Sequence, residues 1–406
     1  CKELGKIPVS MAIDTWAVDY VLLDEKDQIL GDTYGYRDHR TDGMDAEVAK
    51  ILPETELYGK TGIQKQIFNT VYQLMAVKQQ TPELLQQAKT LLMLPDYFGF
   101  RLTGNKLSEY TNGSTTQLVN PDTFQWDKEL IRKLGYPEDI FLPLQMPGTK
   151  VGQLLPEIQK EVGFDLEVVL CGSHDTASAV MAVPQTEGDG IYISSGTWSL
   201  MGIESLKPVI TEDAAAANFT NEGGYDHRFR FLKNIMGLWM IQSVRHEYND
   251  AYSFAQLCDM AEESKEFPSR VDVNDQSFLS PDSMVEAIRQ YCHKTGQPVP
   301  ESVGELTSVV YRSLAQSYGE TVRGLEKIAG KTYDSIHIIG GGSNAAYLNQ
   351  LTADATGKTV YAGPGEATAI GNLLAQMIHA GDLADLKSAR KCVRESFEIK
   401  TFAPAK

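Results

Sequence analysis

The sequence predicts a two-domain α/β protein, and three observations support that prediction. The chain has 406 residues, more than the roughly 250–300 residues at which a single hydrophobic core stops growing. Its composition, 42% hydrophobic and 22% charged, is that of an ordinary globular protein. Segments with strand and helix patterns alternate in both halves of the chain, which is typical of α/β architecture.

In the first half, short apolar runs predict strands and three-to-four-residue spacing predicts helices. A meander comes first, with Glu25–Gln28 as its turn. Gly104 is placed to stop the third helix. The predicted strands are Pro8–Asp14, Asp19–Asp24, Ile29–Tyr34 and Glu167–Cys171, and the predicted helices are Phe68–Gln80, Pro82–Leu92, Pro95–Thr103 and Ala177–Ala182.

The segment Val183–Gly190 is polar and glycine-rich, and we place the domain boundary there. We predict an N-terminal domain over residues 1–184, a C-terminal domain over 188–390 and a C-terminal extension over 391–406. The second domain repeats the strand–helix alternation. Its predicted strands are Gly190–Ser194, Trp198–Glu204, Ser335–Ile339 and Lys358–Ala362, and its predicted helices are Tyr347–Thr356 and Glu366–His379.

Charge and cysteine usage restrict the partners. The formal net charge is −17, and such a field repels nucleic-acid phosphates and anionic lipids. No basic helix-turn-helix pattern favours a DNA-binding regulator. The five cysteines show no CxxC spacing, which favours a reducing cytoplasm and indicates no metal site. We therefore expect small-molecule ligands, with no nucleic acid and no membrane as partners.

Ser194-Ser195-Gly196-Thr197 is a tight turn between two predicted strands. Its glycine lets the backbone approach a ligand, and its hydroxyl and amide groups can hold phosphate oxygens. An ordinary hairpin turn explains the tetrapeptide as well, and taken alone it favours that interpretation.

Three successive glycines, Gly340-Gly341-Gly342, follow a predicted apolar strand and precede a helix. This arrangement allows close contact with a nucleotide and opens a helix amino terminus. Neither a Walker A loop nor a GxGxxG fingerprint is present. The alternative is a flexible connection, but three adjacent glycines are conformationally costly, so we favour nucleotide binding.

His174-Asp175-Thr176 stands at the end of a predicted strand and the start of a helix. A carboxylate there can accept the proton of a substrate hydroxyl, as phosphoryl transfer to an alcohol requires. Asp is also a favoured helix N-cap, and taken alone the tripeptide favours that interpretation.

These motifs belong to a series of blocks that together resemble the FGGY family of carbohydrate kinases, and within it the members that act on L-rhamnulose. The resemblance runs nearly end to end in the same order, which makes it more specific than any single motif. It implies an actin-like ATPase, ribonuclease H-like fold in which sugar and ATP meet between two domains. The blocks are Asp14–Asp19, Tyr36–Thr41, Leu94–Phe98, Glu109–Asn112, Ser173–Val180, Ser194–Gly202, Asn221–Gly224, Leu232–Trp239 and Gly340–Gly342.

The resemblance also implies roles for individual residues. Asp175 corresponds to the general base, and His174 and Thr176 flank it as substrate contacts. Asn234 is similar to a sugar-binding asparagine, and Ala17 stands where the family usually has glycine beside the sugar. The positions that match ATP contacts are Thr197, Gln242 and Gly341.

The implied reaction transfers the γ-phosphoryl group of ATP, with Mg²⁺ as cofactor, to the 1-hydroxyl of L-rhamnulose. We expect a monomer or homodimer. L-Fuculose and xylulose are alternative substrates, and a catalytically silent sugar- or nucleotide-binding protein is the alternative from another class. The family opens with a strand hairpin whose acidic-glycine-hydroxyl loop holds phosphate and magnesium, and nothing similar precedes Lys2. We therefore expect the first strands of the N-terminal domain to be missing from this chain.

Overall fold

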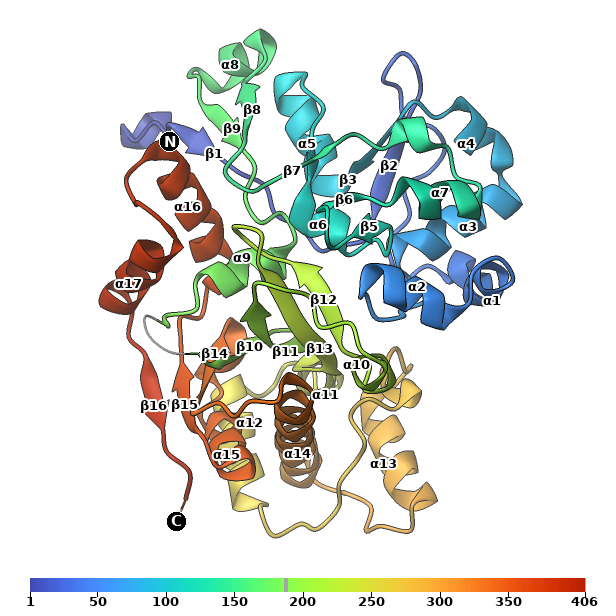
Figure 1. Cartoon of the computed structure of the whole chain (residues 1–406). Coiled ribbons are helices and arrows are strands. Elements are labelled where there is room, and N and C mark those ends of the chain that lie inside the picture. Colours follow the sequence, from blue (N-terminus) through green and yellow to red (C-terminus); the bar gives the residue numbers. More distant parts are fainter. Residues whose placement is uncertain (186–188, 406) are drawn as a thin grey trace. The chain divides into compact units, whose positions relative to one another are not determined.

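A computed structural model describes residues 1–185 and 189–405 (Figure 1). The chain forms two compact units, each assembled from three separate stretches. Unit 1 comprises Cys1–Met181, Glu204–Phe231 and Thr368–Ala389, and unit 2 comprises Ala182–Ile203, Leu232–Ala367 and Arg390–Lys406. Residues 186–188 of the predicted linker lie outside the described residues. The domain limits given above remain predictions.

Unit 1 is built from short strands and helices, and helix α3 lies in its core. Its largest sheet has the order β1-β9-β8, and β2 pairs with β3. Every residue of α3 from Thr70 to Val77 is buried. The strands are β1 (Ser10–Met11), β2 (Tyr20–Leu23), β3 (Thr90–Met93), β4 (Ser108–Glu109), β5 (Val119–Asn120), β6 (Gln125–Trp126), β7 (Leu144–Gln145), β8 (Lys150–Gln153), β9 (Glu167–Val169) and β12 (Thr220–Gly223). The helices are α1 (Met44–Ala49), α2 (Glu54–Thr61), α3 (Thr70–Gln80), α4 (Pro82–Gln87), α5 (Leu94–Thr103), α6 (Tyr110–Ser114), α7 (Lys128–Leu134), α8 (Pro156–Val162), α9 (Asp175–Met181), α10 (Glu212–Ala216) and most of α16 (Ala367–Ala380).

Unit 2 contains a mixed sheet covered by long helices. The full strand order is β12-β13-β11-β10-β14-β15-β16. β12, the first three residues of β13 and the last two residues of β11 are counted in unit 1. The strands are β10 (Ile191–Ser195), β11 (Trp198–Ser205), β13 (Phe229–Met236), β14 (Ser335–Ile339), β15 (Thr359–Ala362) and β16 (Lys400–Phe402). The helices are α11 (Trp239–Glu247), α12 (Phe254–Glu263), α13 (Met284–Lys294), α14 (Val303–Ala329), α15 (Ala346–Thr356) and the end of α17 (Leu386–Ser396).

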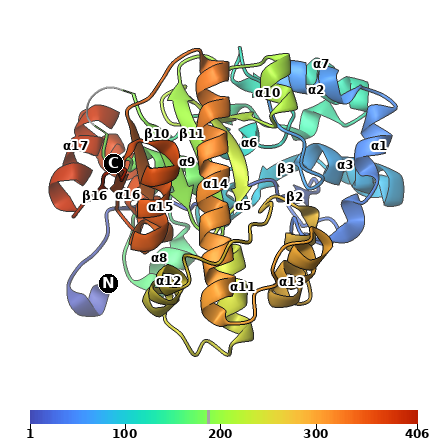
Figure 2. The same cartoon turned by 90° about the horizontal axis from the view of Figure 1, so that it is seen from below.

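The longest helix, α14, packs against α12 and α15 (Figure 2). It begins with a capping box in which Ser302 and Glu305 each bind the other's backbone amide, and it ends at Gly330 with φ +62°. These caps satisfy backbone groups that a helix otherwise leaves unpaired. Among the described residues, no helix is both long and apolar enough to cross a membrane.

Three predicted elements were wrong or too long. The helix predicted for Pro82–Leu92 ends at Gln87, and Thr90–Met93 is instead a buried strand paired with β2. A short apolar run fits a buried helix and a buried strand equally, and the pairing decided it. Only Ile29 of the predicted strand Ile29–Tyr34 bridges Leu23. The first predicted strand shrinks to two residues.

Candidate active site

In unit 1 the segment Ser173–Thr176 lies beside the segment that begins at Asp14. The Thr15 amide donates to the Ser173 carbonyl at 2.9 Å, and the Asp175 amide donates to the Thr15 carbonyl at 2.9 Å. Thr15 and His174 thereby form a parallel bridge. Two blocks about 160 residues apart in sequence are therefore adjacent at the amino end of α9.

A buried carboxylate, Glu109, anchors this segment. Its Oε2 accepts hydrogen bonds from the Ser173 hydroxyl at 2.6 Å and the Ser173 amide at 3.2 Å. It also accepts from the Thr111 hydroxyl at 2.6 Å and the Asn112 amide at 3.0 Å. Burial raises the pKa of Glu109, although these donors lower it. One carboxylate thus fixes the backbone just before His174.

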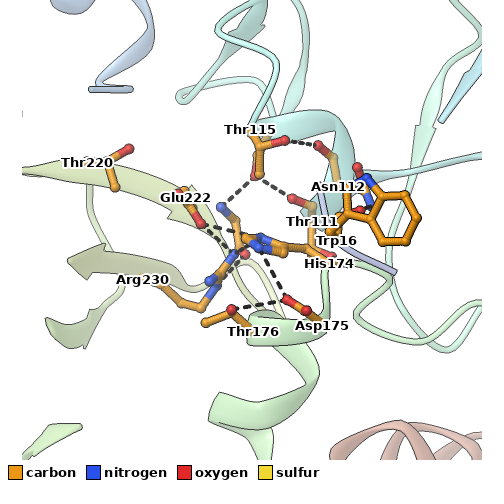
Figure 3. Close-up of polar contacts among 12 residues, drawn as sticks. Trp16, Thr111, Asn112, Thr115, His174, Asp175, Thr176, Thr220, Glu222 and Arg230 are labelled. Atoms are coloured by element: carbon orange, nitrogen blue, oxygen red, sulfur yellow. Dashed lines mark hydrogen bonds and ion pairs between the residues drawn. The ribbon is translucent and has the colours of Figure 1, made fainter. Parts of the chain in front are cut away.

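His174 is 7% exposed and is held from three sides (Figure 3). Its amide donates to the Thr111 hydroxyl at 3.2 Å. Its Nδ1 lies 2.9 Å from Nη2 of Arg230 and 3.3 Å from Oε2 of Glu222. Burial raises the pKa of Glu222, but opposing interactions, of which the charge of the Arg230 guanidinium is the largest, leave that pKa below its ordinary value. The imidazole is therefore fixed by a buried ion pair.

Asp175 is the first residue of α9, and its side chain is 45% exposed. That exposure leaves room for a ligand to reach the carboxylate. Its Oδ1 accepts from the Thr176 hydroxyl at 3.2 Å and lies 3.5 Å from Nε2 of His174. Burial, together with the charge of Asp175, raises the pKa of Asp14. The predicted base therefore has a carboxylate neighbour, an imidazole and a hydroxyl around it.

Ala17 is the first residue of a strained turn. Val18 has φ +69°, a value that a β-branched residue rarely adopts. The Asp19 amide donates to the Ala17 carbonyl at 3.0 Å, which closes a three-residue turn. The Thr70 hydroxyl holds the Val18 carbonyl at 2.6 Å. Beside it, the 49% exposed Trp16 ring donates its Nε1–H to Asp19 at 2.7 Å.

In unit 2 the two glycine turns follow neighbouring parallel strands. Ser194 of β10 is in register with Ile339 of β14, so both turns emerge at the same sheet edge. A Cβ on Gly342 would lie 2.5 Å from the Ser195 Cβ, and one on Gly340 would lie 2.9 Å from the Ser195 carbonyl. A Cβ on Gly341 would meet nothing within 4 Å. Two glycines therefore permit close packing, and the third faces open space.

The turn at Gly196 and Thr197 also receives the start of α11. The Leu238 amide donates to the Gly196 carbonyl at 3.0 Å, and the Trp239 amide donates to the Thr197 carbonyl at 3.1 Å. Gln242 lies one turn further along this helix. The structure therefore brings together at one edge of unit 2 the elements that carry the three predicted ATP residues.

The predicted site residues fall into both units. Ala17, His174, Asp175 and Thr176 belong to unit 1, and Asn234, Thr197, Gln242 and Gly341 belong to unit 2. The amide oxygen of Asn234 is buried and has no hydrogen-bond partner in the part of the chain that the structure describes. An unpaired buried oxygen is costly unless a ligand satisfies it.

The sequence analysis assigned no role to Glu109, Glu222 or Arg230, although two of them lie in blocks that carried the resemblance. A local signal exists for Arg230, which is a lone cation inside the apolar run Phe229–Leu232. Its partner His174 is 56 positions away. Only the folded structure brings them together.

Comparison with known proteins agrees with this geometry. The model of the N-terminal domain of the FGGY family of carbohydrate kinases matches residues 4–182, and that of its C-terminal domain matches residues 191–380. A rhamnulokinase of Halalkalibacterium halodurans is 53% identical over 100% of this chain and 86% of its own length. A rhamnulokinase of Bacillus subtilis is 46% identical over 99% of this chain and 83% of its own length.

Solved structures show the same fold at low sequence identity. A xylulose kinase from Lactobacillus acidophilus superposes with a TM-score of 0.80 at 17% identity, covering 100% of this chain and 81% of that one. A glycerol kinase from Plasmodium falciparum, solved with ADP, gives 0.74 at 15% identity over 98% and 80%. The fold is that of a two-domain sugar kinase. The chain belongs to the FGGY family of carbohydrate kinases, as its motifs predicted.

Proposed function

We propose that this carbohydrate kinase transfers the γ-phosphoryl group of ATP to the 1-hydroxyl of L-rhamnulose, giving L-rhamnulose 1-phosphate and ADP. The observation that carries the proposal is the near full-length similarity, at 41–53% identity, to several proteins named rhamnulokinase. The exposed carboxylate of Asp175 beside a fixed imidazole supports it.

In the proposed mechanism Asp175 takes the proton of the sugar hydroxyl as the hydroxyl oxygen attacks the γ-phosphorus, and ADP leaves on the opposite side. His174 and Thr176, which both lie within 3.5 Å of the Asp175 carboxylate, would orient that hydroxyl. Ala17 and Asn234 are the further sugar contacts. Positioning and electrostatic stabilisation supply most of the catalysis in phosphoryl transfer.

Thr197, Gln242 and Gly341 are proposed to hold ATP. The open space at Gly341 and the exposed hydroxyl of Thr197 fit a phosphate chain, which prefers backbone amides and hydroxyl groups as donors.

Among the described residues no group of three acidic, histidine or cysteine side chains could hold a metal. Mg²⁺ commonly needs only one or two carboxylates besides phosphate oxygens, and Asp14, a neighbour of Asp175, would be a suitable carboxylate. Bound Mg²⁺ would neutralise charge on the phosphates. We further propose a cytoplasmic location and a monomeric or homodimeric state.

A coupled assay of ADP release over a ketose panel tests the substrate. We expect the highest kcat/KM for L-rhamnulose, with L-fuculose and D-xylulose at least about tenfold lower, a difference that two or three altered hydroxyl contacts can supply. Clear preference for another ketose would overturn the substrate and leave the kinase reaction standing. ADP release without any ketose dependence would contradict the reaction itself.

A further inference from the structure

Arg230 is a fully buried cation on β13, at 0% exposure. Its Nε donates to the Gly223 carbonyl at 2.9 Å. Its Nη2 lies 3.0 Å from Oε2 of Glu222 and 2.9 Å from Nδ1 of His174. A carboxylate oxygen and an imidazole nitrogen therefore converge on one guanidinium nitrogen inside unit 1 (Figure 3).

The position of the imidazole proton follows from these distances. A guanidinium in a protein is always protonated, so both hydrogens of Nη2 are donors. Nη2 forms an ion pair with Glu222, and its hydrogen bond is to Nδ1 of His174, which must therefore act as the acceptor. A proton on Nδ1 would instead put two donors face to face at 2.9 Å. Oε2 of Glu222 is also near Nδ1 but farther away, at 3.3 Å. The shorter contact with the guanidinium therefore decides, and the proton of the neutral ring resides on Nε2.

The Nε2–H faces the predicted base. Nε2 is 3.5 Å from Oδ1 of Asp175, which is longer than the 2.7–3.2 Å of an ordinary N–H···O bond. The Nε2–H donor and the Oδ1 acceptor are therefore adjacent but do not form a hydrogen bond with each other. This combination suits a single substrate hydroxyl group, whose oxygen can accept a hydrogen bond from the ring while its proton is given to the carboxylate.

We propose that Arg230 and Glu222 are a positioning pair that holds His174 as the Nε2–H tautomer, so that the ring donates to the sugar oxygen facing Asp175. The role in sugar binding rests on the proposed function, whereas the tautomer does not. A ring nitrogen's proton is commonly set by the partner of the other nitrogen. Here that partner is a buried cation with its own buried counter-ion.

The tautomer can be measured directly by nitrogen NMR on the full chain labelled with ¹⁵N-histidine. We expect the His174 signal, identified by its loss in His174→Gln, to show a protonated Nε2 and an unprotonated Nδ1 without any ligand. His293, which is exposed at the end of α13, should average between tautomers. A proton found on Nδ1 of His174 would overturn the proposal whatever the substrate is.

A matched pair of substitutions tests the donor. The glutamine of His174→Gln reaches the Nε2 position with an amide N–H, whereas the asparagine of His174→Asn reaches only the Nδ1 position. We expect His174→Asn to raise the sugar KM roughly tenfold and His174→Gln to raise it less than about threefold, with the ATP KM unchanged in both. His293→Asn is the control and should change neither constant. Equal sugar KM values for the pair would refute the donor role.

Arg230→Met alone would leave the Glu222 charge buried without its partner and can prevent folding. The double variant Arg230→Met/Glu222→Leu removes both charges and leaves Nδ1 without its donor. We expect mixed tautomers at His174 and a sugar KM raised several-fold at an unchanged ATP KM. A pure Nε2–H signal in the folded double variant would refute the positioning role. If that variant does not fold, the wild-type tautomer and the glutamine–asparagine pair still decide.

Discussion

The candidate sugar site of unit 1 is made of charged side chains, whereas the candidate nucleotide site of unit 2 is made mainly of backbone. Around His174 a carboxylate, a guanidinium and a second carboxylate lie within 3.5 Å of the ring nitrogens. On either side of Gly341, Gly340 and Gly342 pack against Ser195, and the space beside Gly341 is open. The first site therefore depends on which chemical groups are present, and the second on which groups are absent.

This difference predicts how each region responds to substitution. In unit 1, exchanging one functional group for an isosteric one should abolish chemistry while the fold persists. In unit 2, adding a single methyl group should act only by occupying space, without changing any functional group. The predictions below run from the largest expected effect to the smallest.

The largest effect is expected for Asp175→Asn. The amide keeps the shape and cannot take a proton, so kcat should fall at least about 10²-fold while the sugar KM changes little. Steady-state kinetics and isothermal titration with the sugar measure the two quantities. Asp226→Asn, at an exposed loop position of the same unit, is the control. A kcat near that of the wild type would remove Asp175 from the mechanism.

In unit 2, Gly341→Ala and Gly342→Ala separate ligand space from packing space. The methyl group of Gly342→Ala would overlap Ser195, and overpacking should lower the free energy of unfolding by about 1–3 kcal/mol. The methyl group of Gly341→Ala meets nothing, so stability should hold while the ATP KM rises roughly tenfold. Gly59→Ala, at a helix position with open space, is the matched control. An unchanged ATP KM in Gly341→Ala would exclude a phosphate from that space.

How far the sequence predicts these two regions also differs. The loop of unit 2 was largely predictable, because strands Ser335–Ile339 and Thr359–Ala362 are short apolar runs bounded by turn residues. One detail was not, since a 3-10 turn over Gly341–Asn344 separates the glycines from α15.

The site of unit 1 was predictable only in part. His174-Asp175-Thr176 could be singled out, but its supporting partners lie in β12 and β13, strands that the sequence analysis did not identify. The pair Arg230 and Glu222 sits in strands whose alternation is obscured, because β12 is buried at all four residues. The capping box of α14, Ser302 and Glu305, was a local signal that the sequence contained. Long-range pairing is what local patterns leave undetermined.

Two buried carboxyl groups of unit 1 should respond to pH with opposite signs. Burial raises the pKa of Glu222, but opposing interactions, chiefly the charge of Arg230, leave that pKa lowered. The stabilisation from Glu222 is therefore present above about pH 4.5 and is lost as pH falls through the lower folded value. The pKa of Asp96 is raised well above its usual 3.8 by burial and by the charge of Glu109. The folded state then binds that proton more tightly, and stability is lost as pH rises through the raised pKa.

Urea unfolding over a pH series checks both signs. Glu222→Gln should be less stable than the wild type at about pH 7, with the gap narrowing below about pH 4.5. Asp96→Asn should be at least as stable as the wild type at neutral pH, because its amide does not titrate. Any difference in stability in favour of the variant should vanish as pH falls towards 3.8. Parallel stability curves for the wild type and either variant would show that the substituted group is not the source of the pH dependence.

The smallest effect is expected for Ala17→Gly, in the strained turn. The turn's conformation is set by the next residue, because the Thr70 hydroxyl fixes the Val18 carbonyl at 2.6 Å and the Asp19 amide closes on the Ala17 carbonyl. A contact that Ala17 makes through its backbone should therefore survive loss of the methyl group. We expect a sugar KM within about threefold of the wild type and a stability loss of about 0.5–1 kcal/mol from the added chain entropy of glycine.

Thr70→Val is the sharper partner of that experiment, since it removes the hydroxyl that holds the Val18 carbonyl without changing the volume of the side chain greatly. Strain of order 1–3 kcal/mol persists at φ +69° only while such bonds support it. Relaxation of the turn should raise the sugar KM more than Ala17→Gly does, and leave the ATP KM unchanged. If Ala17→Gly instead raises the sugar KM tenfold while Thr70→Val leaves it unaltered, the methyl group itself contacts the sugar, and the backbone geometry of the turn does not determine binding.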